Sequence, residues 1–369
     1  MKTSLLFLLS FSIGFLLQAQ QVSTIFNSAS MQIDDAIIQD VQGNIYGSHY
    51  MGSNVYKITP SGTATIFKSG LNTPNGLAFD SQGNLYVADN IGNRVYKLDS
   101  AGNTIHFTNI TSPSGVIKSI NSDTMIITQF SGHGVRKLAP DGTLMPRFLF
   151  GFPMNGPVGL AYGADSSLYI GNFTDRKVYR WKYDSLKYIA TVPGASNASL
   201  GFISEAHGLL YGTNFQSHQV YEINPNYTDS VRLIAGSTAG NTDGQLSVAK
   251  FNSPNGIYAS KGGDSLLISD FTTGNIRMIT GLVTGILQEK QISFNTNVYP
   301  NPSTNFLKVQ SEELIRSIRI YSMIGKLVYH QEQLNVKSLE LEHFLKGGNY
   351  LLSIFTDKGI ETKKLIVFD

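Results

Sequence analysis

The sequence predicts an all-β protein: a six-bladed β-propeller closed by its own N-terminal strand, followed by a small C-terminal immunoglobulin-like β-sandwich. Two observations lead to this fold class. A unit of about 40 residues recurs six times, and each unit holds four short β-forming runs separated by turn residues, a pattern typical of propeller blades. The repeat then stops near Thr280, and a different series of short β-runs fills the rest of the 369-residue chain.

Residues 1–20 have the pattern of a secretory signal peptide. Lys2 supplies the positive start, residues 5–17 are mainly apolar, and Ala19 is a small residue near which cleavage is expected. The alternative, a membrane anchor, needs about 20 apolar residues, and this stretch is shorter and is interrupted by serine and glycine. We therefore expect an exported mature chain that begins near residue 21 and has no transmembrane segment after cleavage.

The composition excludes several kinds of chemistry. Cysteine is absent from the chain, so there is no disulfide, no thiolate metal site, no cysteine nucleophile and no lipid attachment site. The formal net charge is +2 and the basic residues are scattered, so nucleic acid is not an expected partner. The sequence also lacks the G-x-S-x-G, H-E-x-x-H and glycine-rich phosphate-binding motifs.

The third β-run of each unit ends in an apolar residue, and these ends mark the period. In the unit that starts at Pro74 the four runs are GLAFD, NLYVAD, RVYKLD and TIHFT, with turn residues such as Gln82 and Gly83 between them. Each run is predicted to be one strand of a four-stranded blade. The successive spacings are 40, 40, 43, 42 and 56 residues, and the ends are Ile58, Leu98, Leu138, Trp181, Ile223 and Ile279.

The two ends of the repeat region complement each other. Residues 23–26 read STIF and nearly match ATIF at residues 64–67, the fourth run of the first full unit. The sixth unit, in contrast, stops after its third run. Because an unpaired sheet edge promotes aggregation, we expect the N-terminal strand to complete the sixth blade and close the ring. The propeller would then span residues 21–280.

Residues 235–256 read AGSTAGNTDGQLSVAKFNSPNG and account for the long last spacing. This phrase, followed by a strand containing N-x-R and an apolar pair, resembles the NHL repeat family, and the resemblance covers roughly residues 22–280. It implies a six-bladed propeller of the broad group that includes NHL proteins and gluconolactonase-like hydrolases.

Residues 281–297 are predicted to be a linker, and residues 298–369 a separate β-domain. The phrases YPNP, GKLVY, LKGGNYLLSI and KKLIVF in this segment together resemble the type A C-terminal sorting domain of the type IX secretion system. The resemblance implies recognition by the type IX machinery, and release from or attachment to the outer surface of a Gram-negative, Bacteroidota-like cell. The alternative is an ordinary immunoglobulin-like adhesion module.

In a propeller, the innermost strand of each blade begins, and the second strand ends, on one face around the central channel. Polar residues just before the repeated glycine are expected to meet there on the neighbouring blades 6, 1 and 2, with an apolar wall opposite. In chain order these residues are Asp35, Asn75, Ser114, Val158, Leu200 and Asn255. The second runs are expected to end at His49, Asp89, Thr128, Asn172, Asn214 and Asp270.

Four of these residues, Asp35, His49, Asn75 and Asn255, are candidate ligand-binding groups of the mouth. Carboxylate and amide oxygens suit a divalent cation such as Ca²⁺ or Zn²⁺, for which Asp35, Asn75 and Asn255 are the candidate ligands. A structural role for the four is equally open. Polar residues that recur at one position of the second run are expected instead to hydrogen-bond their own loops, and these are Asp89, Asn172, Asn214 and Asp270.

Aromatic residues follow the second run on blades 1, 4, 5 and 6, whereas blades 2 and 3 carry Asn90 and Gln129 at this position. An arc of rings beside polar groups can stack against a sugar-like ligand or pack between blades, and both roles are open. Tyr50 and Phe271 flank the polar side and are included among the candidate ligand-binding residues. The complete arc is Tyr50, Phe173, Phe215 and Phe271.

Two functions remain open. The first is an exported binding protein that recognises a small polar ligand, a glycan or a protein at the channel mouth, and we favour it because it needs only the mouth surface. The second is the metal-dependent lactonase that the resemblance to gluconolactonase-like propellers implies. In that case Asp34 or Asp35 would replace the glutamate ligand of those enzymes, but Val158 and Leu200 leave the ligand set incomplete.

Overall fold

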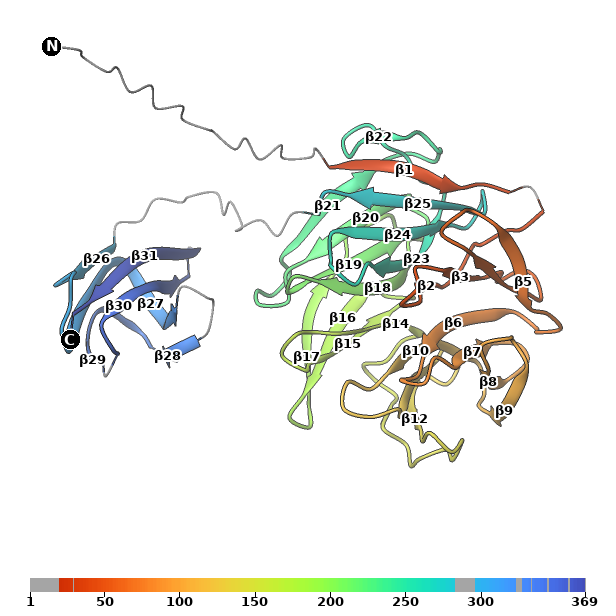
Figure 1. Ribbon diagram of the computed structural model, residues 1–369, viewed down its shortest axis with the longest axis horizontal. Coiled ribbons are helices and arrows are strands. Elements are labelled where there is room, and N and C mark those ends of the chain that lie inside the picture. The colour runs from red at the N-terminus through yellow and green to blue at the C-terminus, as the bar shows by residue number, and fades with distance from the viewer. Residues whose placement is uncertain are drawn as a thin grey trace, which may run out of the picture. The chain divides into compact units, whose positions relative to one another are not determined.

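The computed structural model describes residues 20–28, 30–282, 296–322, 327–332, 334–343, 345–357 and 359–368. The predicted signal peptide, apart from Gln20, and most of the predicted linker lie outside these residues, as do the first two residues of the GKLVY phrase. The chain divides into two compact units, Met1–Thr284 and Gly285–Asp369, and every regular element among the described residues is a strand (Figure 1). No helix in the described part is long and apolar enough to span a membrane.

The first unit contains five four-stranded antiparallel sheets, each formed by consecutive strands. Sheet 1 contains β2 (Ile37–Gln39), β3 (Ile45–Ser48), β4 (Val55–Ile58) and β5 (Ala64–Lys68). Sheet 2 contains β6 (Pro74–Phe79), β7 (Leu85–Asp89), β8 (Arg94–Leu98) and β9 (Thr104–Asn109). Sheet 3 contains β10 (Pro113–Lys118), β11 (Met125–Gln129), β12 (Gly134–Leu138) and β13 (Leu149–Phe150). Sheet 4 contains β14 (Pro157–Tyr162), β15 (Leu168–Asn172), β16 (Lys177–Lys182) and β17 (Ser185–Thr191). Sheet 5 contains β18 (Leu200–Ala206), β19 (Leu209–Asn214), β20 (Gln219–Ile223) and β21 (Val231–Gly236).

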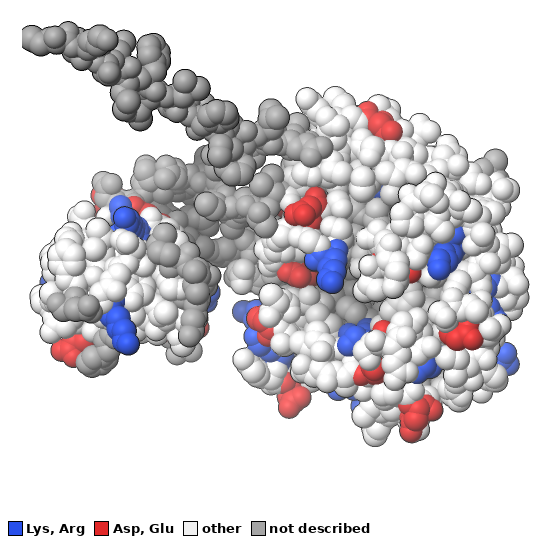
Figure 2. All heavy atoms as spheres, in the orientation of Figure 1, with Lys and Arg blue, Asp and Glu red and all other residues white. Residues whose placement is uncertain are grey.

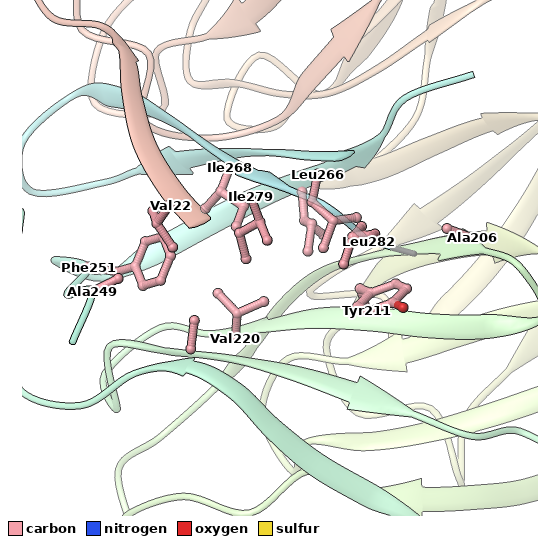
Figure 3. Close-up of a cluster of buried hydrophobic side chains, with 12 residues drawn as sticks. Val22, Ala206, Tyr211, Val220, Ala249, Phe251, Leu266, Ile268, Ile279 and Leu282 are labelled. Atoms are coloured by element: carbon pink, nitrogen blue, oxygen red, sulfur yellow. The ribbon is translucent and has the colours of Figure 1, made fainter. Parts of the chain in front are cut away.

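Sheet 6 joins the two ends of the repeat region. Its strand order is β22-β1-β25-β24-β23, where β1 (Gln21–Phe26) pairs antiparallel with β25 (Asn275–Thr280). Val22 lies opposite Ile279 and is 2% exposed, in a buried cluster that also includes Phe251 and Ile268 (Figure 3). The remaining strands of the sheet are β22 (Gly244–Gln245), β23 (Pro254–Ala259) and β24 (Ser265–Asp270).

The six innermost strands contact one another in cyclic order, β2 with β6, β6 with β10, and so on through β23 back to β2. These strands lie very close together, which explains the repeated glycine. A Cβ added to Gly76 would lie 2.2 Å from the carbonyl oxygen of Ser114 on the next inner strand. For Gly115 the corresponding distance, to the carbonyl of Val158, is 1.9 Å. Only a residue without a side chain fits there.

Hydroxyl side chains on the second strands join neighbouring sheets. Thr213 Oγ1 donates to the carbonyl of Asn255 at 2.6 Å, and Ser269 Oγ donates to the carbonyl of Asp35 at 2.5 Å. Ser48 Oγ makes the same kind of bond, to the carbonyl of the Asn75 residue at 2.8 Å. Because the accepting carbonyls lie at or just before the start of the inner strands, these bonds position the residues that surround the channel mouth.

Arg277 links the 235–256 insertion to sheet 6 directly, and β1 through Asp243. Its side chain is fully buried, and its guanidinium contacts Asp270 Oδ2 at 3.3 Å and Asp243 Oδ1 at 2.7 Å. It also donates to the carbonyls of Lys250 at 2.7 Å and Thr242 at 3.0 Å. Asp243 in turn accepts hydrogen bonds from the backbone N–H and the hydroxyl of Thr24 in β1. The Asp-Gly phrase of the insertion therefore holds the N-terminal strand.

The second unit is built around one long strand, β27 (Phe306–Ser322). Its first half pairs with β26 (Thr296–Tyr299) and β29 (Val336–Glu342). Its second half pairs with β28 (Leu327–Gln331) and β30 (Gly348–Thr356). β30 in turn pairs antiparallel with β31 (Gly359–Val367). The apolar side chains of these strands form one core that includes Leu307, Ile318, Leu352 and Leu365.

Candidate functional site

A cavity of about 260 Å³ lies where the inner strands begin and the second strands end. Its floor comes from the residues that precede the repeated glycine, and its wall comes from the residues that follow the second strands. The lining residues are Asp35, Tyr50, Asn75, Asn90, Ser114, Phe130, Val158, Phe173, Phe215, Asn255 and Phe271. Five of the six predicted ligand-binding residues therefore lie around one cavity, here called the mouth cavity.

The floor of the mouth cavity contains polar atoms that have no protein partner. Asp35, Asn75 and Ser114, at equivalent positions on sheets 1, 2 and 3, are 1%, 6% and 0% exposed. Asp35 Oδ1 accepts a hydrogen bond from Asn255 Nδ2 at 2.7 Å. Asp35 Oδ2, Asn75 Oδ1 and Ser114 Oγ have no hydrogen-bond partner among the described residues. Buried polar atoms are normally paired with protein groups or ordered water, so these three oxygens have unused hydrogen-bonding capacity.

Burial dominates the electrostatics of the floor. It raises the pKa of Asp35 well above its usual range, and the neighbouring carboxylate of Asp34 adds to the shift. Burial also raises the pKa of Tyr50, with the Asp35 charge as the second cause. No lysine, arginine or histidine lines the cavity, and on the molecular face in Figure 2 the basic and acidic side chains are dispersed. Asp35 is thus the one carboxyl group that lines this cavity, and its raised pKa favours the neutral form when no cation is near.

The adjacent carboxylate of Asp34 has a separate role. Asp34 Oδ1 accepts from the backbone N–H of Tyr50 at 2.7 Å, and Asp34 Oδ2 lies 3.5 Å from His49 Nε2. Burial raises the pKa of Asp34 to about 7, although the bond from Tyr50 opposes the shift. Asp34 therefore positions the loop that carries Tyr50, while Asp35 faces the cavity.

The wall of the mouth cavity is an arc of five aromatic rings, here called the collar. Consecutive ring centroids lie 6.4 Å apart for Tyr50 and Phe271, 5.0 Å for Phe271 and Phe215, 6.4 Å for Phe215 and Phe173, and 5.8 Å for Phe173 and Phe130. Asn90 occupies the sixth position of the ring and donates to the carbonyl of Pro113 at 2.9 Å. The collar rings contact one another, so the packing role considered for the arc is present, and since they also line the cavity the ligand-binding role stays a prediction.

His49 differs from the sequence-based expectation because it does not line the mouth cavity. Its ring packs against Gly52 of its own loop, where an added Cβ would lie 2.3 Å from Nδ1, and it faces Asp34. Burial lowers the pKa of His49. The residue has the structural role that remained open in the sequence analysis.

Two expectations from the sequence are wrong by one residue: the end of the second strand in unit 3 and the residue next to the mouth cavity in unit 5. In sheet 3, Pro113 pairs with Gln129, so the second strand ends at Gln129 instead of Thr128, and the collar residue is Phe130. In sheet 5, Leu200 pairs with Asn214 and packs in the core, so Gly201 holds the position next to the cavity. The apolar wall opposite Asp35 is therefore formed by Val158 and the collar, without Leu200.

The residues at the ends of the second strands hold the loops that lead into the inner strands. Asp89 Oδ1 accepts from the backbone N–H of Asn72 at 2.6 Å, and Asn172 Nδ2 donates to the carbonyl of Pro153 at 2.8 Å. Asn214 makes the equivalent bond to Pro193 at 2.6 Å. The expected structural role of this position is present, but the hydrogen-bonded loop is the one before the inner strand.

The floor offers a limited donor set to a cation. No group of three or more His, Cys, Asp or Glu residues that could hold a metal ion occurs in the described part of the chain. Of the three predicted ligands, Asn255 donates its amide N–H to Asp35, and the fully buried oxygens without a hydrogen-bond partner among the described residues belong to Asp35, Asn75 and Ser114. One carboxylate and two neutral oxygens are fewer than the six to eight ligands, roughly, of a protein Ca²⁺ site, and Zn²⁺ prefers nitrogen or sulfur ligands that this cavity lacks.

Phe202 extends across the channel below the mouth cavity. It stands where units 2, 3, 4 and 6 have the repeated glycine, and it packs both against the cluster of sheets 5 and 6 and against the cluster containing Ala36 and Leu77. It lines a second cavity of about 480 Å³, formed by the middle parts of the inner strands. The second cavity shares no lining residue with the mouth cavity.

Comparison with known families finds one match in each of the two units. Residues 23–170 match the SMP-30/gluconolactonase/LRE-like region, and residues 297–368 match the secretion system C-terminal sorting domain. The chain therefore combines a gluconolactonase-like β-propeller region with a sorting domain of the type IX secretion system, as the sequence motifs indicated. It is accordingly a secreted or cell-surface protein of a Bacteroidota-type bacterium.

Solved structures similar to this chain share its propeller fold at low sequence identity. An auxiliary nutrient binding protein from Bacteroides thetaiotaomicron is 16% identical, with a TM-score of 0.58 over 70% of this chain and 76% of that one. A gluconolactonase from Xanthomonas campestris is 16% identical, with a TM-score of 0.56 over 70% and 89%. Virginiamycin B lyase from Staphylococcus aureus is 16% identical, with a TM-score of 0.51 over 67% and 80%. No protein of curated function matches the chain in sequence.

Proposed function

We propose that this chain is an exported binding protein whose mouth cavity holds a small organic ligand. The observation that carries the proposal is the set of three unpartnered buried oxygens, on Asp35, Asn75 and Ser114, beneath a collar of aromatic rings. Sites for small molecules are usually apolar concavities with a few convergent polar groups. At about 260 Å³ the cavity suits a ligand at the small end of the usual range.

The proposal includes the architecture that presents this site. The six sheets would be the blades of one propeller, closed by β1 in sheet 6, and residues 281–297 would link it to the sorting domain of residues 298–369. Support comes from the pairing of β1 with β25 and from the cyclic contacts of the inner strands. The rigid inner strands would hold the floor residues in place without ligand, which lowers the entropic cost of binding.

A lactonase activity is the alternative that the gluconolactonase-like region suggests. It would need a bound metal and a general base at the mouth. Asp35 is the one acidic side chain lining the cavity and would have to serve both purposes. Binding without hydrolysis places no such demand on the site. The similarity in fold to an auxiliary nutrient binding protein is compatible with a binding function.

A cavity-filling substitution tests the proposed location. Thermal-shift screening of the purified full chain against small cationic, neutral and anionic organic molecules should identify stabilising compounds. Val158→Phe, which fills the mouth cavity, should abolish the stabilisation, whereas Ile120→Phe at the edge of the second cavity should leave it intact. Stabilisation that survives Val158→Phe, or that Ile120→Phe alone removes, would place the site elsewhere and contradict the proposal.

A further inference from the structure

Resting on the proposed function, we propose that the ligand of the mouth cavity is a primary ammonium compound with an aromatic or other compact apolar body. The ammonium group binds Asp35, Asn75 and Ser114 on the floor, and the apolar body lies within the collar. Three observations about these residues lead to this assignment: a buried carboxyl group without a cationic partner, three free acceptor atoms, and five aromatic rings that line the same cavity.

The first observation is that Asp35 has no cationic partner. Its side chain is 1% exposed, its one hydrogen bond comes from the neutral amide of Asn255, and no ion pair to it occurs among the described residues. A buried carboxylate is costly unless a cation or several hydrogen bonds compensate for the lost hydration. Without such compensation burial favours the neutral acid. Since no cationic side chain lines the cavity, a cationic ligand would supply the charge that stabilises the ionised form of Asp35.

The second observation is the number and kind of free atoms. Asp35 Oδ2 and Asn75 Oδ1 are acceptors, and Ser114 Oγ can accept as well. They come from equivalent positions of three consecutive inner strands, and the three residues line the same cavity. A primary ammonium group has three N–H donors and no acceptor, and it can therefore satisfy all three oxygens at once.

The third observation is the chemistry of the collar. The faces of aromatic rings carry negative electrostatic potential and attract cations, and the rings also bury apolar groups. The half-buried rings of Tyr50, Phe215 and Phe271 line the cavity above the floor. An anionic ligand would meet the carboxyl group of Asp35 and the aromatic rings without any compensating cation among the residues that line the cavity.

Isothermal titration calorimetry of the full chain tests the assignment with three matched probes. These are 2-phenylethylamine, its neutral analogue 2-phenylethanol, and its trimethylammonium derivative, which keeps the charge but has no N–H donors. The amine should bind about tenfold or more tightly than the alcohol, because hydrogen bonds to a charged group contribute roughly 1.5–3 kcal/mol. The trimethylammonium derivative should also bind more weakly than the primary amine.

Two charge-removing variants complete the test. Asp35→Asn keeps the bond with Asn255 but should remove the preference for the amine over the alcohol. The control Asp141→Asn removes an exposed carboxylate that does not line the cavity, and should retain the preference. Equal affinity for amine and alcohol, an unchanged preference in Asp35→Asn, or no binding of the amine would overturn the ammonium assignment. The proposed binding function would still stand if neutral compounds bind in a manner sensitive to Val158→Phe.

Discussion

Replacing Arg277 with methionine should destabilise the propeller strongly. The guanidinium is fully buried and compensates the charge of Asp270, which is also fully buried. The substitution leaves that carboxylate without a cation and removes the donors to Asp243 and to the carbonyls of Lys250 and Thr242. Removing one partner of a buried ion pair typically costs about 3–5 kcal/mol.

The loss of stability caused by Arg277→Met can be compared with the effect of the same substitution at the equivalent arginine of another sheet. Arg136 pairs with Ile127 in sheet 3 as Arg277 pairs with Ile268 in sheet 6, so the two arginines occupy equivalent positions. Arg136 is half-buried and donates to the carbonyl of Met145 at 3.2 Å. Arg136→Met should therefore cost only about 1 kcal/mol.

Tryptophan fluorescence provides the assay. Trp181 is the only tryptophan of the chain and lies in β16, so its emission reports on the propeller and not on the second unit. A change of 3–5 kcal/mol corresponds to a fall in the melting temperature of roughly 6–20 °C for a domain of this size. If Arg277→Met melts within a degree or two of Arg136→Met, the reasoning about the buried contacts of Arg277 is refuted.

Three further predictions concern the scaffold and export. Burial raises the pKa of Asp34 to about 7 from 3.8, so its contribution to stability is present at low pH and is lost as pH rises from about 4 to 7. Asp34→Asn should therefore gain stability over the wild type by up to about 4 kcal/mol between pH 4 and pH 8, measured by denaturant unfolding; an unchanged difference would exclude the shift. Gly115→Ala should lower the melting temperature markedly, because its Cβ would meet the carbonyl of Val158 at 1.9 Å, and a melting temperature equal to that of the wild type would show that the inner strands can separate at no cost. Deletion of residues 298–369 should leave the propeller in the periplasm, as judged by cell fractionation, whereas secretion at normal yield would contradict the role of the sorting domain.

Sequence periodicity was sufficient to predict the repeated strands, because burial in the sheets requires apolar residues at regular positions. The third strands of four units do end at the predicted residues Ile58, Leu98, Leu138 and Ile223, whereas β16 and β25 each continue one residue beyond the predicted Trp181 and Ile279. The polar floor was also predictable, since Asp35, Asn75 and Asn255 each occupy the place before the glycine position.

The errors arose where a unit departs from the common phrase. Gly201 was aligned with the repeated glycine, but the pairing of Leu200 with Asn214 shows that Phe202 takes that place. Phe130 was missed because Thr128 was taken as the end of a strand that continues to Gln129. A one-residue shift changes which side chain faces the channel, and only the strand register reveals it.

The orientation of individual side chains was a further limit. Asp34 and Asp35 are identical neighbours in sequence, yet one bonds the backbone of Tyr50 and the other faces the mouth cavity. His49 could satisfy either a ligand or Asp34, and its contact with Asp34 depends on the loop conformation around Gly52. Such choices depend on contacts between strands that are distant in sequence, so composition and spacing do not determine them.

A crystal structure of the full chain with saturating 2-phenylethylamine tests the central claim most directly. We expect the ligand in the mouth cavity, with its nitrogen within hydrogen-bond distance of Asp35 Oδ2, Asn75 Oδ1 and Ser114 Oγ and its ring within the collar. Ligand density in the second cavity beyond Phe202, or a mouth cavity that holds only water at saturation, would contradict the account.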